Sequence, residues 1–292
     1  MNPQVKYFFD QQSSTFTYVV YDEHKRIGAI VDPVLDYDGA AGLVSYQSAD
    51  KVLAYIAQEK LAIEWILETH AHADHLTAAQ YIREKTSAKI AIGAGISSVQ
   101  TTFKAVFNFS DDFATDGSQF DHCFVDNECF MLGDIQVTVM ATPGHTNDSL
   151  TYVIGDAAFI GDTMFHPNVG TARCDFPGGD ATMLYHSIQR ILNLPAQTRI
   201  FLCHDYPEQG RSPICEVTIA QQRADNIHIN DGNSEQAFID FRQTRDAQLA
   251  VPELLYPAVQ VNIAAGQFPE AEQNQQIYLK YPVQIHKQPE DH

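Results

Sequence analysis

Four side chains that commonly bind metal ions lie within six residues of the sequence: His70, His72, Asp74 and His75. The preceding run, residues 65–69, has bulky apolar side chains and no helix breaker, which predicts a β-strand. The following run, residues 76–83, is rich in alanine and long side chains, which predicts a helix. The four side chains are therefore expected on a turn between a strand and a helix.

The spacing within this turn divides the side chains into two pairs. His70 and His72 are two residues apart, so on extended backbone they point to the same side. Asp74 and His75 are expected at the start of the following helix, where an aspartate is favourable. A turn of this kind could supply ligands to one or two metal ions.

Three later strand ends carry side chains of the same kind. His145 follows a Pro-Gly turn, Asp162 follows the apolar run 159–161, and His204 ends a strand predicted at residues 199–203. A single histidine at a strand end is more often structural than a ligand. Four such loops together, one of them with the pattern H-x-H-x-D-H, favour a metal centre.

The elements that must position these side chains are strands followed by helices. Strand patterns occur at residues 5–9, 15–21, 27–31, 65–69, 89–92, 129–132, 135–142, 150–154, 157–160 and 199–203. Helix patterns occur at residues 50–60, 76–83 and 180–194, and again between residue 215 and about residue 249. Strands followed by helices, twice over, predict an α/β protein with a four-layer αββα sandwich.

The sequence has no clear linker, so residues 1–292 are expected to form one domain. Residues 36–49 are polar and expected to be irregular. Residues 95–121 are interpreted as an inserted surface excursion that acts as a lid or a subunit contact, with a packed helix and loop as the alternative. Residues 216–292 are expected to be a helical and then irregular C-terminal extension.

The composition narrows the function classes. The chain has 18 Lys and Arg against 37 Asp and Glu, a formal charge of -19, which argues against a nucleic-acid partner because such binding needs a basic surface. The five cysteines include no C-x-x-C pair, which favours free thiols and a cytoplasmic protein. No signal-peptide pattern or membrane-spanning run is visible, so no membrane association is expected.

The candidate ligands, in their order along the chain, resemble the ligand set of the metallo-β-lactamase superfamily. The resemblance runs from about Phe16 to Tyr206 and rests on H-x-H-x-D-H followed by Gly-His, Gly-Asp and a strand-terminal histidine. It implies the αββα sandwich with the metal between the two sheets. The superfamily contains many activities, so the fold alone does not determine the function.

A second block of residues narrows the resemblance. The patterns R-x-D-F at residues 173–176, L-Y-x-S at 184–187 and H-D-Y at 204–206 are similar to those of persulfide dioxygenases, in particular a bacterial subgroup. In that family one Fe(II) is held by two histidines and one aspartate, which by motif position are His70, His145 and Asp162. This ligand set leaves coordination sites open for a substrate sulfur and dioxygen. The other members of the set would surround the iron or hold a second metal ion: His72, Asp74, His75 and His204.

The resemblance implies an Fe(II)-dependent dioxygenase that oxidises glutathione persulfide with O2 to sulfite and glutathione. In this hypothesis Asp175 supports the metal environment and Arg173 anchors the anionic glutathione moiety. Tyr206 donates a hydrogen bond to oxygen or persulfide at the metal. The alternatives are an Arg173–Asp175 ion pair that only holds the loop, and a buried, structural Tyr206. A homodimer is expected from the family.

The main alternative is a hydrolase of glutathione thioesters such as S-lactoylglutathione, similar to glyoxalase II. It would hold two Zn, Fe or Mn ions bridged by Asp162. A lactonase or β-lactamase-like hydrolase is a third hypothesis. A flavodiiron-type redox protein is disfavoured because that group usually has H-x-E where this chain has His70 and His72. A binding scaffold without activity is disfavoured because every ligand position is intact.

Overall fold

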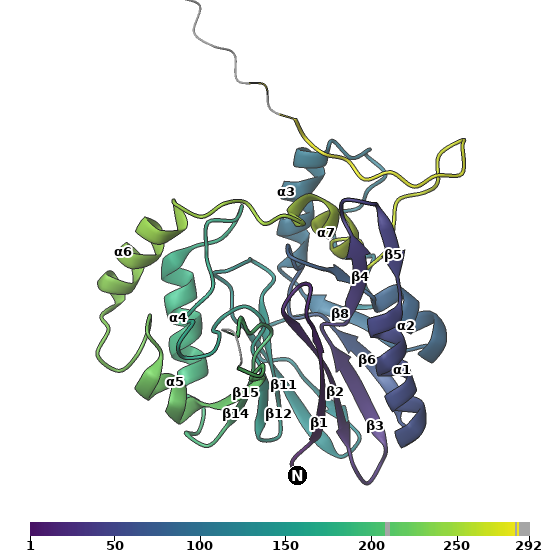
Figure 1. The fold of residues 1–292 in the computed structure, drawn as a ribbon. Coiled ribbons are helices and arrows are strands. Elements are labelled where there is room, and N and C mark those ends of the chain that lie inside the picture. Colours follow the sequence, from purple (N-terminus) through teal and green to yellow (C-terminus); the bar gives the residue numbers. More distant parts are fainter. Residues whose placement is uncertain (208–210, 284, 286–292) are drawn as a thin grey trace, which may run out of the picture.

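The computed structural model of the protein describes residues 1–207, 211–283 and 285. In this part of the chain two six-stranded β-sheets lie face to face (Figure 1). The first has the order β1-β2-β3-β6-β8-β9, with β1 at Gln4–Asp10, β2 at Thr15–Asp22, β3 at Ile27–Val31, β6 at Ala62–Leu67, β8 at Lys89–Gly93 and β9 at His122–Phe124. The second has the order β10-β11-β12-β13-β14-β15, with β10 at Cys129–Leu132, β11 at Ile135–Ala141, β12 at Leu150–Ile154, β13 at Ala157–Phe159, β14 at Arg199–Phe201 and β15 at Glu216–Thr218.

Helices cover the outer face of each sheet. Those on the side of the first sheet are α1 (Gln47–Glu59), α2 (Ala79–Thr86) and α3 (Ile96–Phe107). Those on the side of the second sheet are α4 (Ala181–Leu192), α5 (Ile219–Asp225) and α6 (Glu235–Asp246), seen at the left of Figure 1. The layers run helix, sheet, sheet, helix, which confirms the predicted four-layer sandwich.

Strand β2 shows how the sequence places the sheets at the centre. All eight residues of this strand are buried. Phe16, Tyr18 and Val20 belong to the core between the two sheets, whereas Val19 and Tyr21 belong to the core under the helices. Side chains alternate between the two faces of a strand, so a strand covered on both faces is apolar along its whole length.

A small third sheet supports the loop that carries His70 to His75. It has the order β5-β4-β7 and consists of β5 (Leu43–Ser45), β4 (Val34–Asp38) and β7 (Leu76–Thr77), so the prediction that residues 36–49 are irregular is wrong. Leu76 of β7 pairs with Leu35 of β4. The helix expected from Asp74 therefore begins only at Ala79, because this strand pairing outweighs the helix propensity of the intervening residues.

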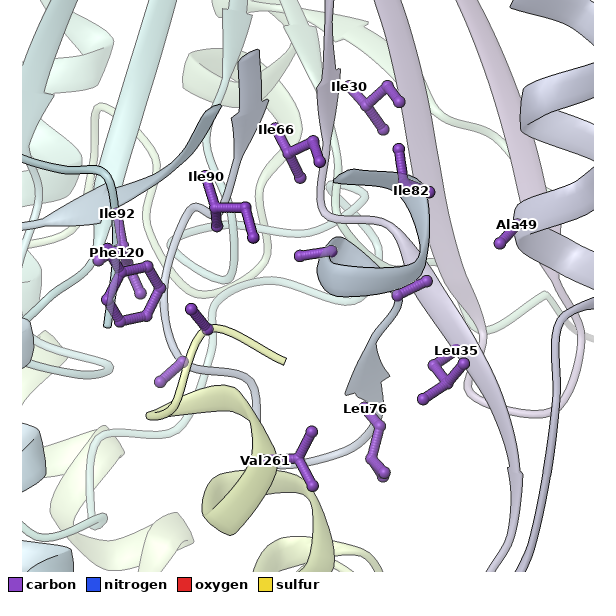
Figure 2. Packing of buried hydrophobic residues seen from close by; sticks show 14 of the residues in the cluster. Ile30, Leu35, Ala49, Ile66, Leu76, Ile82, Ile90, Ile92, Phe120 and Val261 are labelled. Atoms are coloured by element: carbon purple, nitrogen blue, oxygen red, sulfur yellow. The ribbon is translucent and has the colours of Figure 1, made fainter. Parts of the chain in front are cut away.

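Two later segments complete the core on the helix side of the first sheet. The first part of segment 95–121 forms α3, which buries Phe103 in this core and is thus a packed helix. Helix α7 (Leu255–Asn262) lies where an irregular extension was expected, and its Val261 packs in the same cluster as Leu76 (Figure 2). Within the described residues, no helix has the length and apolar character needed to cross a bilayer.

Candidate metal centre

The loops that follow β6, β11, β13 and β14 bring all the candidate ligands together. Ligand atoms within 4.8 Å of one another form overlapping groups. One group is His70, His145 and Asp162, and another is His72, Asp74, His75 and His204. His72 also shares one group with Asp162, Cys203 and His204, and one with Asp32 and Glu68. All of these side chains except Asp74 are buried. His70 and His204 are 134 positions apart in the sequence, yet they meet in one polar cluster inside a largely apolar sandwich.

Asp162 lies between the two groups. Its Oδ2 is 3.8 Å from Nε2 of His70 and 3.7 Å from Nε2 of His145. Its Oδ1 is 3.1 Å from Nε2 of His204, which is in turn 3.4 Å from Oδ2 of Asp74. A carboxylate in this position could bind one ion through either oxygen or bridge two ions.

His72 has different neighbours from His70. Its Nε2 is 3.1 Å from Oδ1 of Asp32 and 4.0 Å from Oε2 of Glu68, and both carboxylates are buried. Thr77 donates a short hydrogen bond to Glu68 through its hydroxyl, at 2.5 Å. His72 thus faces two carboxylates behind the loop, whereas His70 faces Asp162.

These carboxylates determine the protonation tendencies of the buried imidazoles. Burial alone would lower the pKa of each imidazole, but Asp32 raises the pKa of His72 to about 9, and Asp162 and Asp74 raise the pKa of His204 to about 10. His70 lacks a comparable partner, and burial together with His72 places its pKa well below the ordinary value. Burial favours the neutral acid, yet His204 and the other imidazoles hold the pKa of Asp162 well below its usual range.

Three side chains from distant parts of the sequence hold the loop that carries His70 to His75. Asp32 accepts hydrogen bonds from the amide and the hydroxyl of Thr69, at 2.7 and 2.9 Å. Asp148 accepts from the amide of Ala71 at 2.7 Å. Asn262 of α7 donates to the carbonyls of His72 and His75, both at 2.8 Å, and accepts from the amide of Thr77 at 2.9 Å. This network satisfies backbone groups that the loop would otherwise bury unpaired.

A tight turn and the neighbouring helix hold His145. Gly144 has φ +138°, and a Cβ there would lie 2.3 Å from the amide nitrogen of Leu184 in α4, so only glycine fits. Asp180 caps α4 by accepting from the amide of Met183. Nδ1 of His145 lies 2.7 Å from the carbonyl of Arg173, so this nitrogen donates and Nε2 is left for a metal.

The substrate residues proposed from the sequence lie beside this turn. The guanidinium of Arg173 pairs with both carboxylate oxygens of Asp175, at 2.6 and 2.7 Å, and also donates to the carbonyl of Ala250 at 2.7 Å. This pairing raises the pKa of Arg173 and lowers that of Asp175. Tyr206 is half-exposed, and its ring is parallel to that of His204 at 6.1 Å.

Several buried polar atoms at this centre match the requirements of a metal ion. Among the described residues, Nε2 of His70, His75 and His204 and Oδ1 of Asp162 are buried without a hydrogen-bond partner. Buried polar atoms are normally paired, and imidazole nitrogens and carboxylate oxygens are the ligands that zinc and iron use in proteins. The residues present therefore fit a bound metal.

A cavity of about 410 Å³ opens onto the metal centre. At the metal side it is lined by Asp74, His145 and Asp162, and Phe165, Phe176 and Tyr206 form aromatic walls. Its volume falls within the range of small-molecule sites, which run from roughly 300 to 1,000 Å³. The centre is therefore reachable by a substrate while its other sides are enclosed by the sandwich.

The sequence patterns did not identify Asp32, Asp148 or Asn262 as parts of the site. Asp32 is an acidic residue that follows a strand and directly precedes a proline. An acidic residue at a strand end is also the signal that identified Asp162. Asp148 lies three residues after His145 in a loop already considered, but its side chain is not distinguishable from a turn residue. Asn262 carries no local signal, because its role depends on a helix packing beside a loop 187 to 190 residues away.

Comparison with known proteins finds relatives that match most of the chain. Glyoxylase B2 of Dictyostelium discoideum is 47% identical over 287 residues, which cover 98% of this chain and 98% of that protein. A beta-lactamase hydrolase-like protein of Xylella fastidiosa is 47% identical over 96% of this chain, but the chain spans only 65% of that protein's length. Human mitochondrial persulfide dioxygenase ETHE1 is 29% identical over 205 residues, 69% of this chain and 68% of that protein.

A solved structure extends the comparison to the fold. ETHE1 from Myxococcus xanthus matches with a TM-score of 0.71 at 30% identity, over 90% of this chain and 100% of that chain. The family model described as the metallo-beta-lactamase superfamily matches residues 11–204, a range that contains all of the candidate ligands. The chain belongs to the metallo-beta-lactamase superfamily.

Proposed function

We propose that the protein is an Fe(II)-dependent dioxygenase that oxidises glutathione persulfide with O2 to sulfite and glutathione. The observation that carries this proposal is the division of the candidate ligands. His70, His145 and Asp162 form a group of two imidazoles and one carboxylate, and two of them line the cavity. His72 is outside this group of three, and the carboxylate nearest to its Nε2 is Asp32, at 3.1 Å. Two histidines and one carboxylate with open positions are the ligand set of many non-haem iron oxygenases.

The overall reaction balances with one O2 and one water. Both oxygen atoms of O2 are added to the terminal sulfur of the persulfide, and water then cleaves the sulfur–sulfur bond to give sulfite and glutathione. Iron bound at this centre would supply the electron chemistry of the first step. The chain itself would hold the ligands, orient the persulfide and exclude bulk water from the reacting sulfur.

The surrounding residues suit these tasks. The carbonyl of Arg173 orients His145, and the packing of Phe176 against His145, with ring centroids 5.3 Å apart, shields that ligand. Burial, with the nearby charge of Asp162, raises the pKa of Tyr206, so its hydroxyl stays protonated and can donate a hydrogen bond to the substrate. Persulfide dioxygenase ETHE1 of human mitochondria and ETHE1 from Myxococcus xanthus are relatives that support this proposal.

A glutathione thioesterase with two metal ions is the second candidate. It is favoured by Asp162, whose two oxygens face the two groups of ligands separately, as a bridging carboxylate would. Glyoxylase B2 of Dictyostelium discoideum is a more similar relative than the dioxygenases. In this case the two groups of ligands, with Asp162 between them, would hold two metal ions, which would supply an activated water for the hydrolysis of a thioester such as S-lactoylglutathione.

One experiment separates these candidates. The protein is purified, its metal content is counted, and oxygen uptake with glutathione persulfide is measured beside hydrolysis of S-lactoylglutathione. About one iron per chain with oxygen uptake and sulfite release is expected. Two metal ions per chain with thioester hydrolysis and no oxygen uptake would establish the hydrolase instead.

Two further parts of the proposal concern the assembly. We infer a homodimer, which sedimentation velocity tests through the molar mass in solution. We also infer that residues 1–292 form one domain, so limited proteolysis is expected to leave no separately folded fragment. Independent unfolding of a stable fragment would contradict the one-domain inference.

A further inference from the structure

A buried ion pair on α6 lies next to the loop that holds His145. Arg242 and Asp246 are one turn apart on this helix, the outermost on the side of the second sheet, and both are almost fully buried (Figure 1). Oδ1 of Asp246 pairs with the guanidinium of Arg242. Burying two charges costs free energy unless their remaining polar atoms are also bonded, so the other partners of the pair indicate what it does.

These other partners belong to the loop at residues 171–174. Oδ2 of Asp246 accepts a hydrogen bond from the amide of Cys174 at 2.9 Å and another from its thiol at 3.4 Å. Arg242 donates to the carbonyl of Thr171 at 3.0 Å. Burial, together with Asp246, raises the pKa of Cys174 to about 12, so this thiol stays protonated and remains a donor. Helix α6 therefore holds the loop at both of its ends.

The amide of Cys174 belongs to the same peptide group as the carbonyl of Arg173. This peptide bond is trans. A peptide group is planar, so in the trans form its C=O and its N–H point in opposite directions. Because Asp246 fixes the direction of the N–H, it also fixes the direction of the C=O. That carbonyl accepts a hydrogen bond from Nδ1 of His145 at 2.7 Å.

One peptide group thus connects a carboxylate of the C-terminal extension with a candidate metal ligand. Asp246 binds its N–H, and His145 donates to its C=O. A negative charge on the N–H side polarises the peptide group and makes its carbonyl a stronger acceptor. A stronger acceptor at Nδ1 fixes the tautomer of an imidazole and makes its other nitrogen a better ligand.

We propose that Asp246 is a positioning residue for His145, which it orients through the peptide group between Arg173 and Cys174, and that Arg242 holds Asp246 in place for this role. Asp246 binds the peptide group and touches neither the metal site nor the substrate. The inference rests on the proposed function only in taking His145 as a metal ligand. The dioxygenase and the thioesterase share this ligand, so the inference is independent of the reaction.

The test compares two variants that differ only in the acceptor at position 246. Removing one partner of a buried ion pair leaves an uncompensated charge, so both variants also carry Arg242→Gln. In this background Asp246→Asn keeps an oxygen that can accept from the amide of Cys174. Asp246→Leu has a side chain of similar size and no acceptor. Circular dichroism and urea denaturation check that both variants are folded, and Asp246→Ala in the same background replaces the Leu variant if that one does not fold.

Metal binding to the full chain is the readout, so no reaction is required. Affinity for Fe(II) is measured without oxygen by competition with a chelator, and the Leu variant is expected to bind at least about tenfold more weakly than the Asn variant. The visible spectrum of the Co(II)-loaded chain reports the geometry of the ligands. It is expected to change in the Leu variant and to stay close to that of the wild type in the Asn variant.

Asp22→Asn provides a matched control at the other end of the sandwich. Asp22 is a fully buried carboxylate that, like Asp246, binds backbone amides, three of them at 2.8 to 3.1 Å. It ends β2, whereas the first residue of this strand, Thr15, lies beside the metal centre with its hydroxyl 3.1 Å from Nδ1 of His204. We expect Asp22→Asn to lower the free energy of unfolding and to leave the metal affinity and the cobalt spectrum unchanged.

Equal metal affinities and identical cobalt spectra in the Asn and Leu variants would overturn the inference, because the pair would then only stabilise the fold. An equal loss of metal affinity in Asp22→Asn would overturn it too, because any loss of stability would then weaken the metal centre. A failure of the proposed function is a separate result. A wild-type chain that binds iron and takes up no oxygen would overturn only the dioxygenase.

Discussion

The metal centre and the cavity wall beside α6 place histidines in opposite electrostatic surroundings. At the metal centre His72 and His204 lie among carboxylates, which raise their pKa values to about 9 and about 10 against the effect of burial. At the cavity wall His228 lies near Arg242 and Arg245, and burial with these cations lowers its pKa to about 4. The surroundings of the histidines are therefore negative in the first region and positive in the second. Neighbouring charges, rather than the histidines themselves, decide whether each imidazole is protonated.

The substitution with the largest expected effect is Asp162→Ala, which should abolish metal binding. Asp162→Ala removes the carboxylate that faces both groups of ligands, so we expect loss of bound metal, at least about 100-fold weaker affinity, and no activity. Metal content and oxygen uptake measure this, and circular dichroism checks that the variant is folded. Full metal occupancy in a folded Asp162→Ala variant would remove this residue from the ligand set.

The second prediction compares the two histidines of the H-x-H pair. If one iron is held by His70, His145 and Asp162, His70→Ala abolishes metal binding, whereas His72→Ala keeps about one ion per chain. The reason is that the carboxylate nearest to Nε2 of His72 is Asp32, at 3.1 Å, whereas His70 groups with His145 and Asp162. Metal analysis of both variants side by side decides the point. Equal loss of metal in the two variants would favour two ions and the hydrolase.

The third prediction concerns Asn262, whose side chain holds the loop that carries His70 to His75. We call this set of hydrogen bonds the Asn262 clamp. Asn262→Ala leaves the carbonyls of His72 and His75 and the amide of Thr77 without their partner. We expect the free energy of unfolding to fall by about 1–3 kcal/mol and metal affinity to weaken by about tenfold. Urea denaturation and metal titration measure these changes.

Asn274→Ala provides the control for this clamp. Its side chain donates to the hydroxyl of Tyr278 at an exposed position, so its removal should change stability by less than about 0.5 kcal/mol. Equal effects of the two substitutions would show that Asn262 has no special role in holding the loop.

The smallest effect is expected at the cavity wall beside α6 and depends on pH. In the folded chain His228 is neutral above about pH 4, whereas its ordinary pKa is 6.5, so between these values the unfolded chain binds more protons. The free energy of unfolding should therefore decrease as pH falls from 6.5 toward 4, and part of this decrease should be absent in His228→Asn. Denaturation at several pH values measures it, and identical pH profiles for the two proteins would contradict the assignment.

The candidate ligands that the structure brings together could be picked out from sequence because each loop carries its own signal. A histidine or aspartate at a strand end is visible locally, and the apolar pattern of the strands predicts the layers. The residues that hold these ligands could not be predicted in the same way. Asn262 and Asp148 act on a loop far away in the chain, and β7 forms because Leu35 pairs with Leu76. Such partners are specified by tertiary packing, which local propensity does not contain.

The arginines of the cavity wall illustrate the same limit. Arg173 is conspicuous in the sequence beside Asp175, but in the structure the two form an ion pair. Arg245 has no distinguishing pattern in the sequence and lines the cavity only because α6 packs beside it. An arginine's availability depends on its neighbours in space.

The clamp made by Asn262 has a consequence for how the protein is made. Residues 70–75 leave the ribosome long before residue 262, yet the carbonyls of His72 and His75 depend on that side chain. A nascent chain therefore carries its histidines on a loop that is still incomplete. We therefore expect metal loading to follow the docking of α7, because until then these carbonyls lack the partner that holds the loop.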